Sequence, residues 1–220
     1  MPKLKPEVQT ARREHILDAA ETCFARAGFH RTTMHDICKE AGVSPGALYV
    51  YFDSKEALIA GICERDRAMF AERFDALAAA PDFMPALREL GERYFVDNPA
   101  KDHRMCVEIG LESTRNPRIG EIHQRIDRYI LESFTKLFQS MHDQGRIAPA
   151  LDIPTVARAF MLVADGMFWR RAVDPSFDPK AVMPAVMSLI RTLLNPVAEP
   201  DPASGPAPTQ ASVSNNQTTR

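Results

Sequence analysis

The fold of this chain is indicated by residues 33–52, TMHDICKEAGVSPGALYVYF. Thr33 is followed three positions later by Asp36, an arrangement that caps the free backbone amides of a helix start. Ser44 repeats this signal and is followed by a proline, which is well tolerated at the first helical position. Gly42 lies between the two starts and can supply the positive φ that a tight turn requires. The stretch therefore predicts a helix-turn-helix.

The second helix of this pair is expected to contact DNA. Its start consists of small residues, Ser44, Pro45, Gly46 and Ala47. Small residues let the backbone and the positive end of the helix dipole approach a polyanion or a groove wall. Tyr49 and Tyr51 can donate hydroxyl hydrogen bonds to phosphates, and Lys55 can neutralise a phosphate charge.

The rest of the chain is predicted to be helical. Apolar residues recur every three or four positions, and the 220 residues include only 10 glycines, so helices are favoured over strands. Capping, glycine and proline signals divide the chain into about nine helices. Their expected ranges are 7–27, 33–41, 44–51, 54–80, 83–96, 101–115, 117–143, 153–173 and 179–194. The predicted fold class is all-α.

Three regions are expected along the chain. Residues 1–53 form a three-helix domain that contains the helix-turn-helix, and residues 54–195 form a larger helical domain. Residues 196–220 contain five prolines and no Leu, Ile, Met or aromatic side chain. Such a segment buries too little apolar surface to offset the entropy of ordering, so it is predicted to be a disordered tail.

Composition is typical of a globular protein, with 45% apolar and 25% charged residues. No stretch approaches the roughly 18 apolar residues of a membrane helix, and the start of the chain lacks a secretory pattern. A cytoplasmic protein is therefore expected. The four cysteines are Cys23, Cys38, Cys63 and Cys106. Their wide spacing disfavours a CxxC metal site and a disulfide framework, so neither a metal nor a cofactor is expected.

Net charge does not by itself indicate a nucleic-acid binder. The chain has 27 Lys and Arg against 29 Asp and Glu, a net charge of −2. Attraction to phosphate must therefore come from basic residues placed on one face. The candidates near the helix-turn-helix are Lys3, Lys5, Arg12, Arg13 and Arg31, and each is equally compatible with an ordinary solvated face.

Over about residues 10–63 the sequence resembles the DNA-binding domain of the TetR family of bacterial transcriptional regulators. The residues that carry this resemblance are Ile16-Leu17-Asp18-Ala19-Ala20, Phe24, Gly28-Phe29, Thr32-Thr33, Asp36-Ile37, Ala41-Gly42-Val43-Ser44, Gly46, Leu48-Tyr49, Tyr51-Phe52 and Lys55-Glu56-Ala57-Leu58. In that family the third helix enters the major groove. The resemblance implies base-proximal roles for residues 44–47 and phosphate contacts by Thr33, Tyr49, Tyr51 and Lys55. Val50 departs from the larger or polar residue that many members carry there.

The resemblance also implies an effector site within the bundle of the fifth to eighth helices. The candidate lining residues are Phe83, Leu87, Tyr94, Met105, Ile109, Phe134, Phe138, Met161, Met167, Phe168 and Trp169. Methionine and aromatic side chains suit an apolar or aromatic small molecule. The alternative for each of them is ordinary core packing. Candidates for polar contacts with the effector are Arg115, Glu112, His103, His123 and Asp165.

Two short segments of the C-terminal half, residues 108–112 and 165–170, resemble BetI-like members of the same family. The last two helices resemble the family's dimer interface. The candidate interface residues are Val156, Ala159, Phe160, Val163, Val182, Val186, Leu189, Ile190 and Leu193. A two-fold dimer binds two half-sites, so a palindromic operator is expected.

The sequence therefore predicts a ligand-responsive repressor that an effector releases from DNA, in control of an efflux or catabolic operon. One alternative is a redox-sensing regulator that uses Cys106 or Cys63, and another is a ligand-independent regulator. An enzyme that uses Cys106 with His103 is disfavoured. These two residues share a helix face, but no oxyanion-hole turn, glycine-rich phosphate loop or HExxH motif accompanies them.

Overall fold

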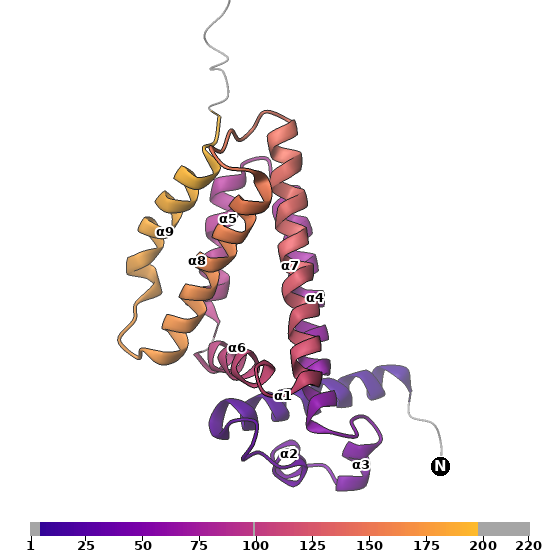
Figure 1. The fold of residues 1–220 in the computed structure, drawn as a ribbon. Helices are drawn as coiled ribbons and strands as arrows, with labels where there is room; N and C mark the ends of the chain where they lie inside the picture. Colours follow the sequence, from indigo (N-terminus) through magenta and orange to yellow (C-terminus); the bar gives the residue numbers. More distant parts are fainter. Residues whose placement is uncertain (1–4, 99, 198–220) are drawn as a thin grey trace, which may run out of the picture.

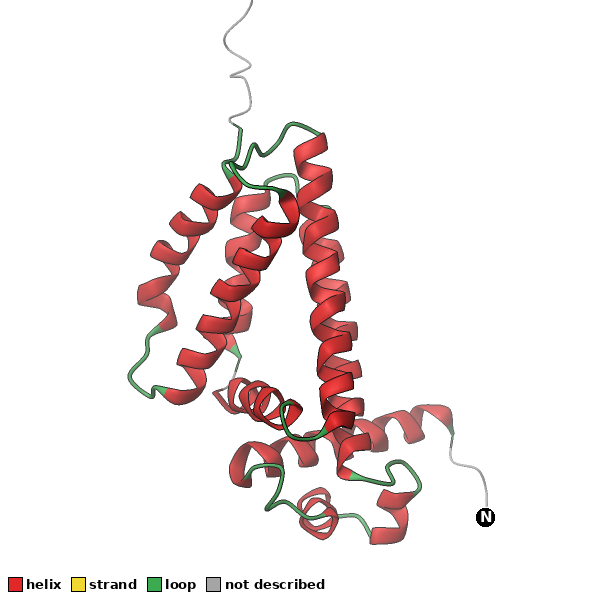
Figure 2. Ribbon diagram, in the orientation of Figure 1, coloured by secondary structure: helices red, strands yellow, loops and turns green. Residues whose placement is uncertain are grey.

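The computed structural model describes residues 5–98 and 100–197, and within these the chain is helical (Figures 1 and 2). The helices are α1 Pro6–Ala27, α2 Met34–Ala41, α3 Pro45–Tyr49, α4 Lys55–Ala78, α5 Phe83–Glu92, η1 Arg93–Asp97, α6 Ala100–Ser113, α7 Pro117–Asp143, α8 Ile153–Val173 and α9 Pro179–Leu194. The segment η1 is a π-helix. The described residues contain no strand, which confirms the predicted all-α class.

The predicted signals for the helix-turn-helix are confirmed. The Thr33 hydroxyl accepts from the Asp36 amide, and the Asp36 carboxylate accepts in return from the Thr33 amide, which completes a capping box. The Ser44 hydroxyl accepts from the Ala47 amide at 3.2 Å and begins α3. Gly42 ends α2 with a φ of 62° in the left-handed region. These local hydrogen bonds stabilise two helices too short to persist alone.

Several predicted helix boundaries differ from the structure by one or two residues, as for α4 and α6, and two of the differences have a cause in the hydrogen bonding. The helix expected over residues 83–96 is α-helical only to Glu92 and continues as the π-helical η1. The helix expected over 44–51 ends at Tyr49, because the amide of Tyr51 bonds the Leu48 carbonyl in a tighter turn. Pattern-based prediction follows the apolar spacing and does not detect a change in hydrogen-bond register.

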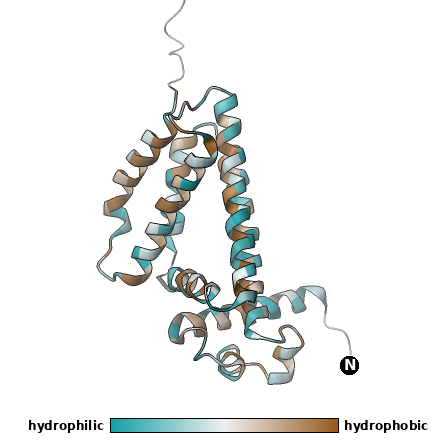
Figure 3. Cartoon of the chain, in the orientation of Figure 1, coloured by the Kyte–Doolittle hydropathy of each residue, from teal (hydrophilic) through white to brown (hydrophobic). Residues whose placement is uncertain are grey.

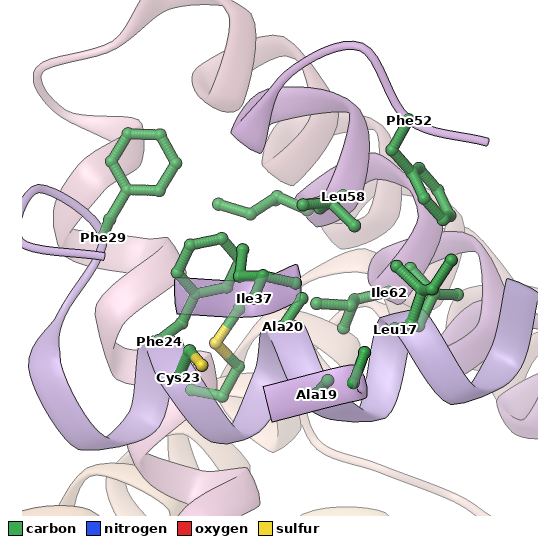
Figure 4. Close-up of a cluster of buried hydrophobic side chains, with 14 of the residues drawn as sticks. Leu17, Ala19, Ala20, Cys23, Phe24, Phe29, Ile37, Phe52, Leu58 and Ile62 are labelled. Carbon is green, nitrogen blue, oxygen red and sulfur yellow. The ribbon is translucent and has the colours of Figure 1, made fainter. Parts of the chain in front are cut away.

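Two apolar clusters form the core. The N-terminal cluster joins α1, α2 and α3 to the first half of α4, and Figure 4 shows Phe24, Ile37, Leu58 and Ile62 among its side chains. The C-terminal cluster joins the rest of α4 to α5, α7, α8 and α9. The helix α4 therefore contributes to both clusters, and the N-terminal core extends past the domain boundary expected at residues 53 and 54.

Ion pairs also hold α4 against α1. The Arg65 guanidinium lies 2.7 Å from an Asp18 carboxylate oxygen and 2.8 Å from one of Glu21. In Figure 1, α1, α2 and α3 form one end of the molecule, α4 and α7 rise from it together, and α6 lies across the top of this end. Packing of α6 against both α1 and α8 makes it a link between the two halves.

The end of the described chain differs from the sequence expectation. Pro196 and Val197 were expected to begin a disordered tail, but the Val197 amide donates to the Arg146 carbonyl at 2.9 Å. Pro196 forms an isolated antiparallel bridge with Ile147. These contacts are made by backbone groups, which an argument from the side-chain composition of the segment does not consider. The remainder of the predicted tail, residues 198–220, lies outside the described residues.

Candidate nucleic-acid interface and effector domain

The helix α3 is anchored on one side and open on the other. Leu48 is fully buried in the N-terminal cluster and Phe52, just after α3, is nearly so. On the opposite side Tyr49 is 53% exposed and Val50 is 78% exposed. Because only one face is needed for packing, the other face can contact a partner.

The start of α3 is also open. Ser44, Pro45 and Gly46 are exposed and Ala47 is half-buried. A Cβ atom built on Gly46 would meet no other atom within 4 Å. Figure 1 places α3 at the end of the molecule away from α5 and α9. The small residues expected to approach bases therefore lie together on an accessible helix start.

The expected phosphate contacts differ in accessibility. Thr33 is exposed and Tyr51 is half-buried. Lys55 is turned inward, because its Nζ donates to the Phe29 carbonyl and lies 4.3 Å from the centroid of the Phe29 ring. Partial burial lowers the pKa of Lys55. A phosphate contact by Lys55 would have to share or exchange this hydrogen bond.

The basic residues expected near DNA are also in different surroundings. Lys5, Arg12 and Arg31 are exposed. Arg13 is half-buried, pairs with Glu14 at 3.0 Å and lies 5.4 Å from the centre of the Phe52 ring. Lys3 lies outside the described residues. Three of the five candidates are therefore accessible on the N-terminal part of the chain.

The helix α6 makes a group of polar contacts with the end of the molecule formed by α1, α2 and α3. Glu108 accepts a short hydrogen bond from the Phe29 amide, and Glu112 lies 2.8 Å from Nε2 of His30. Glu112 is only 4% exposed, so its carboxylate is buried at this contact. Glu112 was predicted to contact an effector, but it lies against His30. Contacts between segments far apart in sequence leave no local signal, which is why this one was missed.

The expected effector-lining residues lie mostly in the core. Those that are buried are Phe83, Leu87, Met105, Ile109, Phe134, Phe138 and Met167, and those that are half-buried are Tyr94, Met161 and Phe168. Met105 and Ile109 belong to the N-terminal cluster, and the others, apart from Phe168, pack in or against the C-terminal one. Phe168 contacts the rings of Tyr94 and Phe95, which border that cluster. Trp169 is 56% exposed and does not join either cluster.

Aromatic rings pack closely in the C-terminal cluster. The centroids of Phe134 and Phe160 are 4.5 Å apart. Beside the cluster, the centroid of Phe168 lies 5.0 Å from that of Phe95 and 5.3 Å from that of His103. A groove of about 420 Å³ opens elsewhere, between α5 and α9. Its lining residues are Met84, Pro85, Arg88, Glu89, Glu92, Pro184, Met187, Ser188 and Arg191. None of the expected effector-lining residues lines this groove.

The other expected polar effector contacts are dispersed. His103 is buried, with Nε2 2.9 Å from the Tyr94 carbonyl oxygen. Asp165 is exposed as a whole, but partial desolvation of its carboxyl group and the nearby carboxylate of Asp127 raise its pKa. His123 is half-buried and Arg115 is exposed. Among them, Asp165 and His123 interact electrostatically across α7 and α8.

The expected dimer residues divide into two groups. Val156, Phe160 and Ile190 are buried in the chain's own C-terminal cluster, so they are not available to a partner. Leu189 is exposed, and the half-buried residues are Ala159, Val163, Val182, Val186 and Leu193. Two further apolar residues of α8 that the sequence pattern did not single out, Leu162 (71% exposed) and Val173, are also exposed. Figure 3 shows apolar residues along α8 and α9.

The cysteines are separated by burial. Cys23, Cys38 and Cys63 are buried and Cys106 is exposed. Burial raises the pKa of Cys63 to about 12, which suppresses the reactive thiolate. Within residues 5–98 and 100–197, no three His, Cys, Asp or Glu side chains are grouped as metal ligands. In the same part of the chain no helix has the length and hydropathy to span a membrane.

Two family models match the chain. The model described as bacterial regulatory proteins, tetR family, matches residues 16–62. The model described as BetI-type transcriptional repressor, C-terminal, matches residues 83–195. The first covers most of α1, the helix-turn-helix and the start of α4, and the second covers α5 to α9. Both resemblances seen in the sequence are thus confirmed.

Two similar proteins are also helix-turn-helix transcriptional regulators. The HTH-type regulator YfiR of Bacillus subtilis (strain 168), described as uncharacterized, is 33% identical over 174 residues, which cover 76% of this chain and 82% of YfiR. UidR of Escherichia coli (strain K12) is 29% identical over 171 residues, 76% of this chain and 84% of UidR.

Among solved structures, Salmonella enterica GusR has a TM-score of 0.73 and 28% identity, covering 88% of this chain and all of that one. A SmeT–triclosan complex has a TM-score of 0.72 and 25% identity, covering 90% of this chain and all of SmeT. The exposed α3, the two helical cores and these matches lead to one conclusion. The chain belongs to the TetR family of bacterial transcriptional regulators.

Proposed function

We propose that this regulator is a repressor that binds a palindromic operator as a homodimer and releases it when an apolar or aromatic small molecule binds. The observation that carries the proposal is the open face of α3. Tyr49 and the small residues at the helix start are accessible, while Leu48 fixes the helix to the core. An accessible recognition helix on a rigid support is the arrangement that major-groove binding requires.

Dimerisation is supported by exposed apolar side chains on the last two helices. Leu162, Trp169 and Val173 of α8 and Leu189 of α9 are large and exposed. Covering such side chains with a second copy removes apolar surface from water. A single α3 has five residues, so two copies are needed to provide enough base contacts for specificity.

The effector class is supported by the chemistry of the C-terminal cluster. Phenylalanine and methionine side chains dominate it, and such side chains can repack around an apolar ring system. The SmeT structure contains triclosan, an aromatic compound of this class. To weaken operator binding a hundredfold, an effector must prefer the non-binding state by roughly 2.7 kcal/mol. We further propose that the repressor controls an efflux or catabolic operon, whose products would remove or degrade such a compound.

A redox-sensing regulator is the second candidate, and one observation favours it. Cys106 is exposed on α6, the helix that links the two halves. Oxidation there would change the polarity of this helix. Loss of operator binding on mild oxidation, restored by a thiol reductant, would favour this candidate over the effector-released repressor.

The experiment that tests the proposed function begins with selection of DNA from a random duplex library by the purified protein. The expected product is an inverted repeat. Calorimetry then measures triclosan binding to the free protein and to the operator-bound protein. The proposal expects weaker binding to the operator complex. Equal affinity in both states would contradict release by this probe, and enrichment of no sequence would contradict operator binding itself.

A further inference from the structure

We propose that Glu108 and Glu112 are positioning residues for operator binding, which hold the loop at residues 28–30 and thereby set the orientation of the helix-turn-helix relative to α6. This inference rests on the proposed function, because it concerns how operator affinity is regulated. Neither residue lies on the DNA-facing helix α3. Their effect on DNA is therefore indirect and passes through the backbone that precedes α2.

The first contact fixes the backbone of Phe29. The Glu108 carboxylate accepts from the Phe29 amide, and Nζ of Lys55 donates to the Phe29 carbonyl. Phe29 is thus held from α6 through its amide and from the start of α4 through its carbonyl. Hydrogen bonds to charged groups are short and directional. They specify one orientation of the loop more strictly than apolar contacts do.

The second contact lies one helical turn further along α6. Residues four apart share a helix face, so Glu112 faces the same loop as Glu108 and meets His30 at 2.8 Å. Lys55 also interacts with Glu112 electrostatically. Four residues later, Asn116 donates to Glu56 of α4 at 3.0 Å. The end of α6 and the start of α7 therefore form a continuous polar contact with the loop and α4.

The loop passes this constraint to α2. The hydroxyl of Thr32 is buried and shares its proton between the carbonyls of Cys23 and Gly28, at 3.1 and 2.8 Å. The next residue, Thr33, is the cap of α2. The chain between Phe29 and the helix-turn-helix thus has little freedom, and a displacement of the α6 carboxylates is transmitted to α2 and α3.

The other end of α6 contacts the expected effector region. His103 is buried beside Phe168 of α8, with a centroid separation of 5.3 Å, and its Nε2 lies 2.9 Å from the Tyr94 carbonyl of η1. Any ligand that changes the packing around Phe168 therefore acts on the start of α6. The helix α6 thus connects the packing around Phe168 with the carboxylates of Glu108 and Glu112. Regulation of DNA binding by an effector requires such a connection between the two sites.

The test compares three variants of the full chain on the selected operator duplex by fluorescence anisotropy. Glu108→Ala removes the acceptor, Glu108→Gln keeps an oxygen that can accept from the Phe29 amide, and Glu121→Ala removes an exposed carboxylate of α7 as the matched control. Glu108→Ala is expected to weaken operator binding roughly tenfold, as the loss of a hydrogen bond to a charged group allows. The other two variants are expected to bind as the parent does.

A second measurement covers the outcome in which Glu108→Ala does not fold. His30 is exposed, so His30→Ala is expected to fold, and its effect on operator affinity should be non-additive with that of Glu112→Gln. Hydrogen exchange of the Phe29 amide reports the Glu108 contact without DNA and is expected to accelerate in folded Glu108→Ala. If folded Glu108→Ala binds the operator as tightly as the parent, or if the His30 and Glu112 effects add, the inference is overturned. Failure of the parent protein to bind any DNA would instead overturn the proposed function.

Discussion

The carboxylate of Glu108 lies directly against the position that a side chain on Gly28 would occupy. A Cβ atom on Gly28 would come within 3.0 Å of Glu108 Oε1, and the φ of Gly28 is 79°. Gly28→Ala is therefore expected to lower the free energy of unfolding by roughly 1–3 kcal/mol, because it strains the backbone and displaces the carboxylate. Urea denaturation measures this change.

Gly110→Ala is the matched control for that variant. Gly110 lies in α6, and a Cβ atom there would meet no other atom within 4 Å. Alanine favours the helix over glycine by roughly 0.5–1 kcal/mol, so this variant should be as stable as the parent or more so. Equal stability of Gly28→Ala and Gly110→Ala would contradict the close approach of Glu108.

The Thr33 capping box predicts a pH dependence. Hydrogen bonds from the Thr33 hydroxyl and amide lower the pKa of Asp36 in the folded chain. This stabilisation is therefore present above the ordinary pKa of about 3.9 and is lost as the pH falls through the lower folded value. Asp36→Asn is expected to be less stable than the parent near pH 6, and the difference should shrink in acid. Urea titrations at several pH values measure it, and a difference that does not change with pH would contradict this role of Asp36.

Thiol labelling tests the arrangement of the cysteines. Cys106 is exposed, whereas Cys23, Cys38 and Cys63 are buried. A maleimide reagent is therefore expected to modify one thiol per native chain and four after unfolding, as counted by mass spectrometry. In Cys106→Ser the native chain should remain unmodified. Rapid native labelling of Cys63 would contradict both its burial and its raised pKa.

A charge on the exposed apolar face of α8 is expected to disrupt the proposed dimer. Leu162→Glu places a carboxylate where the interface would remove water, and an unpaired buried charge costs several kcal/mol. Light scattering should then report monomers, with operator binding strongly reduced. Leu151→Glu is the matched control, because Leu151 is also exposed but lies in the loop before α8. A dimeric Leu162→Glu protein would place the interface elsewhere.

The structure could be predicted from the sequence where interactions between residues close along the chain determine it. The capping residues Thr33 and Ser44 and the left-handed Gly42 act within a few residues, so the helix-turn-helix could be predicted. The two family resemblances extended the prediction of the fold to both halves of the chain. Contacts such as that between Lys55 and Phe29 join residues 26 positions apart, and neither residue type predicts the other.

Burial in the C-terminal half was harder to predict. Apolar spacing identifies a helix face but not whether that face meets the chain's own core or a partner. Val156 and Phe160 thus proved to be internal, while Leu162 and Trp169 proved to be exposed. The surroundings of the polar candidates could not be predicted for a similar reason. Glu112 is buried against His30, which precedes it by about eighty residues along the chain.

The central claim is that the protein binds a two-fold symmetric operator through α3. The most direct test is a titration of the selected operator duplex with the parent protein and with Tyr49→Ala, in which fluorescence anisotropy measures binding. The account predicts that the parent binds an inverted repeat with two chains per duplex. It also predicts that Tyr49→Ala weakens binding to all sequences by a similar factor, as expected for a lost phosphate contact. Binding of one chain to a site without two-fold symmetry, or unchanged affinity in Tyr49→Ala, would contradict it.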